Sequence, residues 1–190
     1  MVYNGVLKGR FVNLRSVTED DAAFILEIRS NPAISKYLPQ IRITVEQQQA
    51  WITKQRVDSD SYYFIITDKE HNKIGTISVY NIFDGHAEVG RYCSIGDFVQ
   101  NSEAVILHND FIFNILFLNY IDGWVYKDNT HVLSLNKGFG YEVDGEALDK
   151  DGIPYFYGKI TKQNYLLKSL KVRNNINKIS SHVPNVGLME

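Results

Sequence analysis

The stretch VYKDNTHVLSLNKGFGYEVDG, residues 125–145, holds the most informative local pattern in this chain. A strand-like segment, YIDGWVY (120–126), ends in polar residues and leads to Asn129. Asparagine is common at this kind of position, where it caps the first turn of a helix. A short helical segment follows, and then Gly140 and Tyr141 open another strand-like segment. The pattern predicts a strand–helix–strand unit with a polar side chain at the first junction.

The composition is that of an ordinary soluble domain. The chain has 190 residues, of which 44% are hydrophobic and 22% are charged, and its net charge is −2. No basic stripe stands out before residue 168, so nucleic-acid binding is not expected. The length fits one domain, which we place at residues 1–165, followed by a C-terminal helix or tail at 166–190.

Several classes of site and location are disfavoured by the sequence. Cys93 is the single cysteine, which excludes an internal disulfide and a cysteine-based metal cluster. The five histidines are scattered without metal-ligand spacing, so no metal site is expected. The N-terminus does not resemble a signal peptide, and the most apolar stretch, 110–121, is about half a membrane span. We therefore expect a cytoplasmic protein that has no membrane partner.

The order of expected elements predicts an α/β (α+β) fold with a mixed, mostly antiparallel central sheet flanked by helices. A three-strand meander stands in the middle, and strand–helix–strand crossovers follow it, so ligands are expected where strand ends splay. Strands are expected at 11–17, 62–67, 73–82, 86–95, 120–126, 140–146 and 152–160. Helices are expected at 19–30, 45–57 and 103–119, after Asn129 and from 161, with a loose polar end from 173 onward.

Four segments carry a resemblance to a known family. They are LKGRFVNLRSVTEDDA (7–22), EIRSNPAISKYL (27–38), KIGTISVYNI with AEVGRY (73–82 and 87–92), and DNTHVLSLNKGFGYE (128–142). The last is the most specific, because it resembles the pattern N-x-x-S/A-x-x-L-x-x-x-x-G-F without a gap. The matching residues are Asn129, Val132, Leu135, Gly140 and Tyr141.

Over about residues 8–165 the chain resembles the GNAT superfamily of acyl-CoA-dependent N-acetyltransferases. The branch that it resembles includes ribosomal-protein alanine acetyltransferases and acetyltransferases of nucleotide-linked amino sugars. The resemblance implies acetyl-CoA as co-substrate and an Asn129 that reaches its pantetheine or phosphate region. It also implies that pantetheine pairs with a strand edge formed by Tyr92, Cys93, Ser94 and Ile95.

The chain departs from the family at the expected pyrophosphate loop, which usually contains glycines. The equivalent residues are Gln100, Asn101, Ser102, Glu103 and Ala104. In one interpretation, backbone N–H groups and polar side chains at a helix N-terminus still bind the phosphates. In the other, the site has decayed and CoA no longer binds. Glu103 suits a first helical turn but would repel a nearby phosphate.

A second departure concerns the proton donor to the leaving thiolate. Many family members place a tyrosine seven residues after the asparagine, and this chain has Asn136 there. Tyr141 or Tyr92 are the candidate substitutes. In the other interpretation, no proton donor is needed, because a thiolate whose thiol has a moderate pKa leaves readily.

The resemblance implies Glu88 as the candidate base, acting directly or through water. It also implies that a backbone N–H of the same strand, near residues 91–93, stabilises the developing oxyanion. Alternatively, Glu88 is an exposed glutamate or one paired with Arg91 or Arg29. Cys93 is expected to be a small buried strand residue rather than a nucleophile, and His86 and His108 are expected to be structural.

The leading functional hypothesis is direct acetyl transfer to a small-molecule primary amine, most specifically a nucleotide-linked amino sugar of bacterial surface polysaccharide. Protein N-terminal acetylation and a catalytically degenerate binding protein are the alternatives. A homodimer is compatible with the sequence but has no readable signal. The expected substrate contacts combine a guanidinium, amides and aromatic faces: Arg29, Asn31, Tyr37, Trp51, Tyr80 and Asn81.

Overall fold

The computed structural model describes residues 1–180 and contains one eight-stranded sheet. The strand order is β1-β2-β3-β4-β5-β6-β8-β7, and every pair is antiparallel except β5 and β6. The predicted mixed, mostly antiparallel fold is thereby confirmed. The strands are β1 (Val6–Lys8), β2 (Asn13–Ser16), β3 (Tyr62–Thr67), β4 (Lys73–Phe83), β5 (His86–Ser94), β6 (Tyr120–Tyr126), β7 (Glu142–Leu148) and β8 (Pro154–Thr161).

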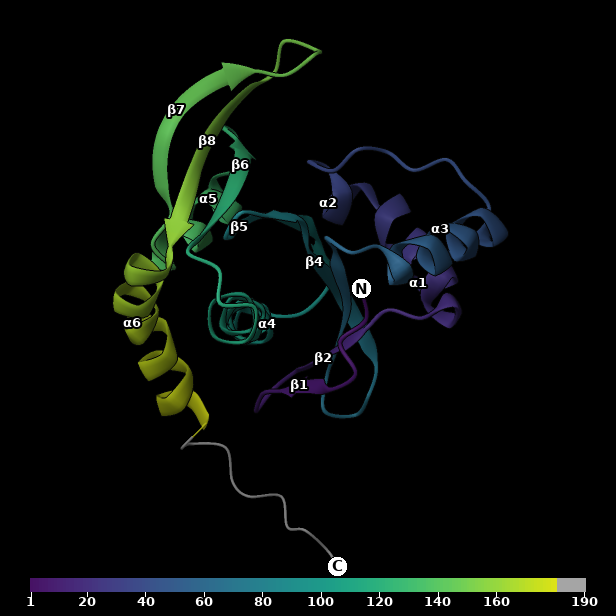
Figure 1. Cartoon of the computed structure of the whole chain (residues 1–190), viewed down its shortest axis with the longest axis horizontal. Helices are drawn as coiled ribbons and strands as arrows, with labels where there is room; N and C mark the ends of the chain where they lie inside the picture. Colours follow the sequence, from purple (N-terminus) through teal and green to yellow (C-terminus); the bar gives the residue numbers. More distant parts are fainter. Residues whose placement is uncertain (181–190) are drawn as a thin grey trace, which may run out of the picture.

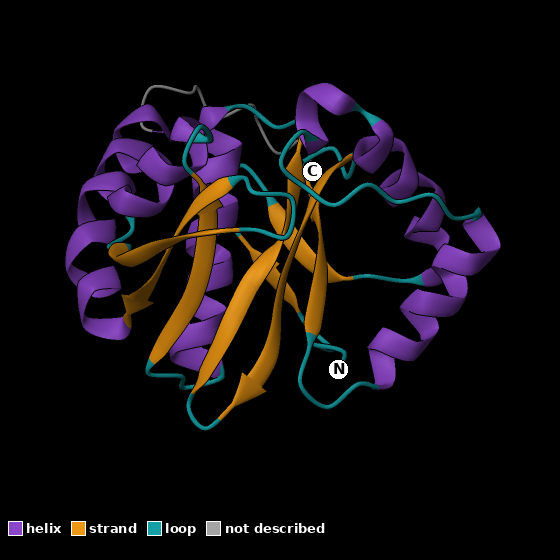
Figure 2. Cartoon of the chain, turned by 90° about the horizontal axis from the view of Figure 1, so that it is seen from above, coloured by secondary structure: helices purple, strands orange, loops and turns teal. Residues whose placement is uncertain are grey.

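Helices cover the sheet on both sides (Figures 1 and 2). One group, α1 to α3, follows a short 3-10 turn and packs on β3, β4 and β5, whereas α4 lies on the opposite face. The helices are α1 (Ala22–Ser30), α2 (Pro32–Ser35), α3 (Val45–Val57), α4 (Phe98–Asp110), α5 (Thr130–Gly138) and α6 (Lys162–Ser180). A wider π-helical turn, η2 (Phe111–Ile115), continues α4.

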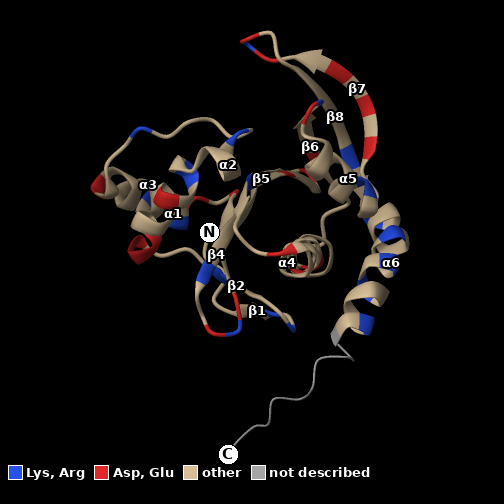
Figure 3. Cartoon of the chain, turned by 180° about the vertical axis from the view of Figure 1, so that it is seen from behind, with Lys and Arg blue, Asp and Glu red and all other residues tan. Residues whose placement is uncertain are grey.

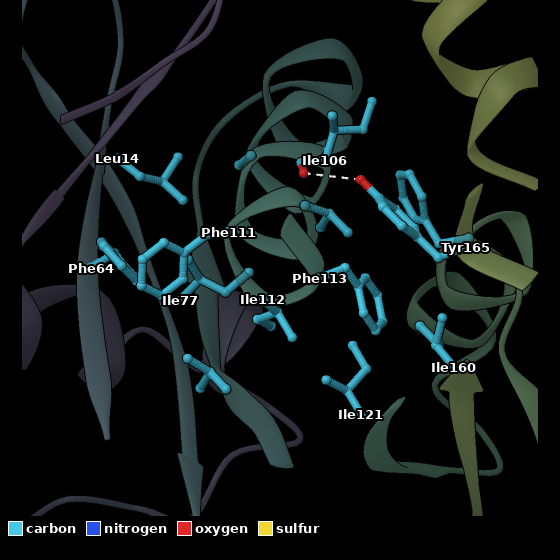
Figure 4. Close-up of a cluster of buried hydrophobic side chains, with 14 of the residues drawn as sticks. Leu14, Phe64, Ile77, Ile106, Phe111, Ile112, Phe113, Ile121, Ile160 and Tyr165 are labelled. Atoms are coloured by element: carbon cyan, nitrogen blue, oxygen red, sulfur yellow. Dashed lines mark hydrogen bonds between the residues drawn. The ribbon is translucent and has the colours of Figure 1, made fainter. Parts of the chain in front are cut away.

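The main core forms where α4 and η2 press against the sheet (Figure 4). Phe111, Ile112 and Phe113 are fully or almost fully buried there, which explains the strongly apolar sequence of this segment. Tyr165 of α6 completes the cluster, and its hydroxyl donates a hydrogen bond to the Ile106 carbonyl at 3.1 Å. Burying these aromatic rings gives the helix and the sheet a fixed relative position.

Some expected boundaries were exact, several strand ends were shifted by one or two residues, two helices were wrong, and β1 and α2 were not expected. The helix at 45–57 and the strands at 62–67 and 120–126 have their predicted bounds. The helix expected at 103–119 instead begins at Phe98, because Asp97 and Gln100 form a capping box, with reciprocal hydrogen bonds of 2.8 and 3.0 Å. The expected loop of residues 100–104 therefore lies within the first turns of α4.

The C-terminal segment also differs from the expectation. Residues 173–180 were expected to be loose, but they continue α6. Arg173 explains this order, because its Nη2 donates to Asp110 Oδ1 at 2.6 Å and to the Tyr165 hydroxyl at 2.7 Å. The helix is thus held to α4 beyond its apolar part. The rest of the expected tail, 181–190, lies outside the described residues.

Glu103 connects α4 to the start of the sheet. Its side chain is buried, and its two carboxylate oxygens accept hydrogen bonds from the backbone N–H groups of Arg10, Phe11 and Val12 at 2.8, 2.6 and 2.9 Å. These three N–H groups belong to the turn between β1 and β2, and the Glu103 carboxylate supplies them with a charged acceptor. A carboxylate placed in this way has a structural role and is not aimed at a phosphate.

Replacing Glu103 with alanine should lower the free energy of unfolding by about 3 kcal/mol, since one buried and two partly buried N–H groups would lose a charged acceptor. Urea unfolding monitored by tryptophan fluorescence measures this. Glu27→Ala, at an exposed position of α1, is the matched control and should change the value by less than about 0.5 kcal/mol. Equal stability of the two variants would contradict the role assigned to Glu103.

Candidate active site

The sheet opens between β5 and β6. The two strands pair over only three positions, His86 to Glu88 opposite Tyr120 to Asp122. Further along, β5 carries a bulge, because Thr76 and Ser78 of β4 face Cys93 and Gly90 with an extra residue on β5. Arg91 lies in this bulge with φ +49°, a conformation uncommon for a side chain other than glycine. The bulge turns β5 away from β6 and leaves part of its edge without a partner strand.

A cavity of about 680 Å³ fills this opening, a size typical of small-molecule sites. On one side it is bounded by α4 and α5, and on the other by residues 33–39 around α2. Residues from both faces of β5 line it. Tyr92 packs towards the α4 core, whereas the Arg91 guanidinium lies 4.4 Å from the Tyr80 ring on the opposite face. The cavity therefore passes through the sheet rather than lying on one side of it.

The residues expected to bind the cofactor do not all reach this cavity. Tyr92, Cys93, Ser94, Asn101 and Asn129 line it. Outside the lining are Ile95, Gln100, Ser102, Glu103 and Ala104. Among these, Ala104 is fully buried and Gln100 is occupied by the capping box. The structure thus places the strand edge and Asn129 together, and it places most of the expected pyrophosphate loop inside helix α4.

Asn129 both caps α5 and borders the cavity. Its Oδ1 accepts a hydrogen bond from the Val132 N–H at 3.4 Å, near the long limit for such a bond. The cap is therefore weak, and the amide remains on the cavity wall. Asn136, which replaces the usual tyrosine, lies on the same wall one to two turns further along α5.

The two tyrosines considered as proton donors have different surroundings. The Tyr141 hydroxyl donates to the Gly123 carbonyl at 3.0 Å, and burial raises the pKa of Tyr141 to about 12. The Tyr92 hydroxyl is buried without a hydrogen-bond partner, and burial raises the pKa of Tyr92 as well. Both groups stay protonated near neutral pH, and only that of Tyr92 is uncommitted.

The expected substrate contacts separate into two groups. Arg29, Tyr37 and Tyr80 line the cavity. Asn31 instead caps α2 by accepting a hydrogen bond from the Ala33 N–H at 3.0 Å, and Trp51 packs edge-on against Tyr63, with ring centroids 5.8 Å apart. Neither of these two side chains lines the cavity, so their surroundings are those of ordinary structural residues.

A smaller groove of about 360 Å³ adjoins the cavity and shares the β6 residues 122–124 with it. Glu88 and Asn81 lie in this groove, and Asn81 donates to Glu88 Oε1 at 2.8 Å. Within residues 1–180, Glu88 forms no ion pair with Arg91 or Arg29, the alternative that the sequence left open. The candidate base therefore stands beside the deep cavity rather than inside it.

Several polar residues of the cavity were not singled out from the sequence as site residues, among them His108, Asn109 and Asp122. His108 Nε2 and Asn109 Nδ2 are buried without partners. Burial lowers the pKa of His108 to about 3, so its imidazole is neutral. Their presence inside an otherwise apolar helix was a sequence signal that they could face a site. The signal was not usable, because the face that they occupy depends on where α4 begins.

Cys93 has the surroundings of a structural thiol. Its Sγ donates a long contact of 3.7 Å to the Ile28 carbonyl, and burial raises its pKa to about 11. Such a thiol is almost entirely protonated at neutral pH and is a weak nucleophile. Among residues 1–180 there is no cluster of three metal-ligating side chains, and no helix there is long and apolar enough to cross a membrane.

Comparison with known proteins agrees with this geometry. Residues 12–142 match the family model described as "Acetyltransferase (GNAT) domain". The acetyltransferase PseH of Campylobacter jejuni, in two strains, is 28% identical over 80% of this chain and 92–93% of its own length.

Solved structures share the fold at lower identity. One described as "Apo FdhC- a nucleotide-linked sugar GNAT" has a TM-score of 0.77 at 23% identity, covering 90% of this chain and 98% of its own. The spermidine N-acetyltransferase of Vibrio cholerae in complex with CoA and spermine has a TM-score of 0.74 at 20% identity, covering 82% of this chain and 98% of its own.

The buried His108 predicts a pH dependence of stability. Its pKa is lowered in the folded state, so between pH 6.5 and about 3 only the unfolded chain binds this proton, and stability falls as pH falls. The contribution reaches about 1.4 kcal/mol per pH unit. His108→Gln should reduce the acid slope of the unfolding free energy by that amount, and an unchanged slope would contradict it. His131→Gln, which removes an exposed imidazole, is the control.

Proposed function

The chain belongs to the GNAT family of acyl-CoA-dependent N-acetyltransferases, and on that premise we propose that it transfers acetyl from acetyl-CoA to the primary amine of a nucleotide-linked amino sugar. The observation that carries the proposal is the cavity through the sheet, because direct transfer needs both substrates bound at once with their reacting atoms in contact, and a cavity lined from both faces can hold one substrate on each side. Likeness to PseH, and to a solved structure described as a nucleotide-linked sugar GNAT, supports the choice of acceptor.

In this proposal the free edge of β5 and the inner face of α4 hold the donor. The strand edge from Tyr92 to Ser94 offers backbone groups that an extended pantetheine arm can pair with. The N–H groups of the β5 bulge are the donors for the carbonyl oxygen as it gains charge. The phosphates would lie at the N-terminal end of α4, where the Asn101 side chain borders the cavity.

The acceptor would enter from the side of α2. Arg29 supplies a guanidinium, which is suited to a pyrophosphate, and burial lowers its pKa without neutralising it. Tyr37 and Tyr80 add aromatic faces of the kind that pack on sugars and bases. Arg91 and Lys36 also line the cavity and add positive charge, although Lys36 Nζ lies 3.6 Å from Asp128 Oδ2. A positively charged, aromatic wall favours a nucleotide-linked acceptor over a polycation.

The first test is calorimetric titration of acetyl-CoA into the wild-type protein and into an Asn129→Ala variant. We expect binding that weakens about tenfold in the variant, which corresponds to about 1.4 kcal/mol, because a cavity-facing amide is lost. Asn114→Ala, at an exposed position of η2, is the control and should bind like the wild type. No heat at millimolar ligand would refute the enzyme and leave the binding-protein alternative.

The second test measures acetyl transfer to a panel of acceptors under the same conditions. The rate is read from the free CoA thiol that each reaction releases. Nucleotide-linked amino sugars should be turned over, whereas the N-acetylated forms of the same sugars should not, since they lack a free amine. A peptide with an N-terminal alanine tests the protein-acetylating alternative. Faster turnover of the peptide than of every amino-sugar nucleotide would overturn the proposed acceptor while leaving the acetyltransferase activity in place.

A further inference from the structure

We propose that Asp122 is the catalytic residue that removes the proton from the acceptor amine, and that Glu88 beside it acts by adjusting its affinity for that proton. The inference rests on the proposed acetyl transfer and names a residue of that site. It is independent of the acceptor's identity, because every primary amine must lose a proton before it attacks the thioester.

The register of the parallel strands places Asp122 at the point where the sheet opens. Glu88 and Asp122 are directly opposite each other in the last paired position of β5 and β6. Ala87 and Ile121, one position earlier, are both buried in the core on the α4 side. Because neighbouring residues of a strand point to opposite faces, Glu88 and Asp122 share the other face. The two carboxylates therefore lie side by side at the point where β5 and β6 separate.

Asp122 has the better access of the two carboxylates. It lines both the deep cavity and the adjoining groove, whereas Glu88 lines only the groove. Glu88 is also held by Asn81, through a hydrogen bond of 2.8 Å. Among residues 1–180, the ion pair of the Asp122 carboxylate is with His86 Nε2, at a distance of 4.0 Å. A base that stands where two spaces meet can reach an amine arriving through either of them.

The opposite side of the same cavity independently indicates a polar ligand. His108 Nε2, Asn109 Nδ2 and the Tyr92 hydroxyl are buried on the α4 side and have no hydrogen-bond partner. Buried polar groups are seldom left unpaired, because desolvation without a partner costs free energy. A ligand with polar groups within the cavity would supply those partners, and Asp122 lines the same cavity.

The surroundings of Asp122 raise the pKa of its carboxyl group above the ordinary aspartate value. Burial raises its pKa, and the carboxylates of Glu88 and Asp144 act in the same direction. His86 and Lys159 oppose this, but Lys159 Nζ is 3.4 Å from Asp144 and is shared with it. Acidic residues also lie along β7 (Figure 3). A raised pKa makes the carboxylate a stronger base, which is what proton removal from an ammonium needs.

The step balances without any further reagent. The ammonium of the acceptor gives one proton to the Asp122 carboxylate and becomes a neutral amine. Its lone pair then forms a C–N bond with the thioester carbon, and the C–S bond breaks. The second amine proton goes to the leaving thiolate, which gives CoA thiol and the amide. Asp122 releases its proton to water through the groove.

The test compares Asp122→Asn and Glu88→Gln across pH in steady-state acetyl transfer. Asp122→Asn should lower kcat at neutral pH by about 100-fold or more and should recover part of it at high pH, where the free amine is more abundant. Glu88→Gln should keep kcat within about tenfold and should move the acid limb of kcat/KM to lower pH, because removing a neighbouring negative charge lowers the pKa of Asp122.

Asp151→Asn, in the exposed turn between β7 and β8, removes the same charge elsewhere and should behave as the wild type. Acetyl-CoA affinity should be the same in all four proteins, which separates proton transfer from donor binding. A wild-type kcat in Asp122→Asn, or a 100-fold loss confined to Glu88→Gln, overturns the proposal. If amino-sugar nucleotides are not turned over but a simple primary amine is, the proposed acceptor fails, and the same comparison is made with that amine.

A carbon-detected NMR titration of the Asp122 carboxyl gives a readout that does not depend on turnover. Its pKa should lie above the ordinary aspartate value in the wild type and should fall in Glu88→Gln. An ordinary value that Glu88→Gln leaves unchanged overturns the assigned role of Glu88 and, with it, the proposal.

Discussion

The short parallel pairing of β5 with β6 is the constraint on which the site depends. The two strands are joined over three positions and then separate, whereas β6 remains paired with β8 along its full length. Separation exposes backbone groups that would ordinarily be satisfied within the sheet, and such groups are costly if they stay unpaired away from water. The chain accommodates them in a cavity, where a ligand can supply the missing hydrogen bonds. The separation of β5 from β6 therefore both shapes the cavity and leaves backbone groups that a bound ligand can pair with.

The departure from the usual glycine-rich loop is easier to understand once α4 is placed. Asp97 and Gln100 cap the helix, and Glu103 holds the turn between β1 and β2. Asp97 and Gln100 thus hold the first turn of α4 together, and Glu103 fixes the helix to the sheet, with side-chain hydrogen bonds that a glycine loop cannot provide. Fewer backbone N–H groups are then freely offered to a phosphate. Under the proposed function, donor binding would depend more on the β5 edge and on Asn129 than on the start of α4.

Local sequence signals predicted the fold better than they predicted the site. The helix at 45–57 has Thr44 as its cap, and the strand at 62–67 is a run of aromatic and branched residues, so both have sharp boundaries. The start of α4 was missed, because the helix begins within a segment that reads as a polar loop. Asp122 was missed for a different reason. Its position beside Glu88 depends on the register between strands that are more than thirty residues apart in sequence, and no local pattern encodes that register.

The replacement of the usual tyrosine by Asn136 fits the arrangement of the cavity. A proton donor to the thiolate is needed least where the leaving group has a moderate pKa, as a thiol has. The difficult proton is the one on the ammonium, since a protonated amine has no lone pair with which to attack. In the proposed reaction, the two carboxylates at the point where β5 and β6 separate take up that proton. The Tyr92 hydroxyl, which has no hydrogen-bond partner, lies on the acetyl-CoA side of the cavity. Under the proposed function, the base therefore matters more than the acid, and a chain with Asn136 in place of the tyrosine retains the groups that acetyl transfer depends on most.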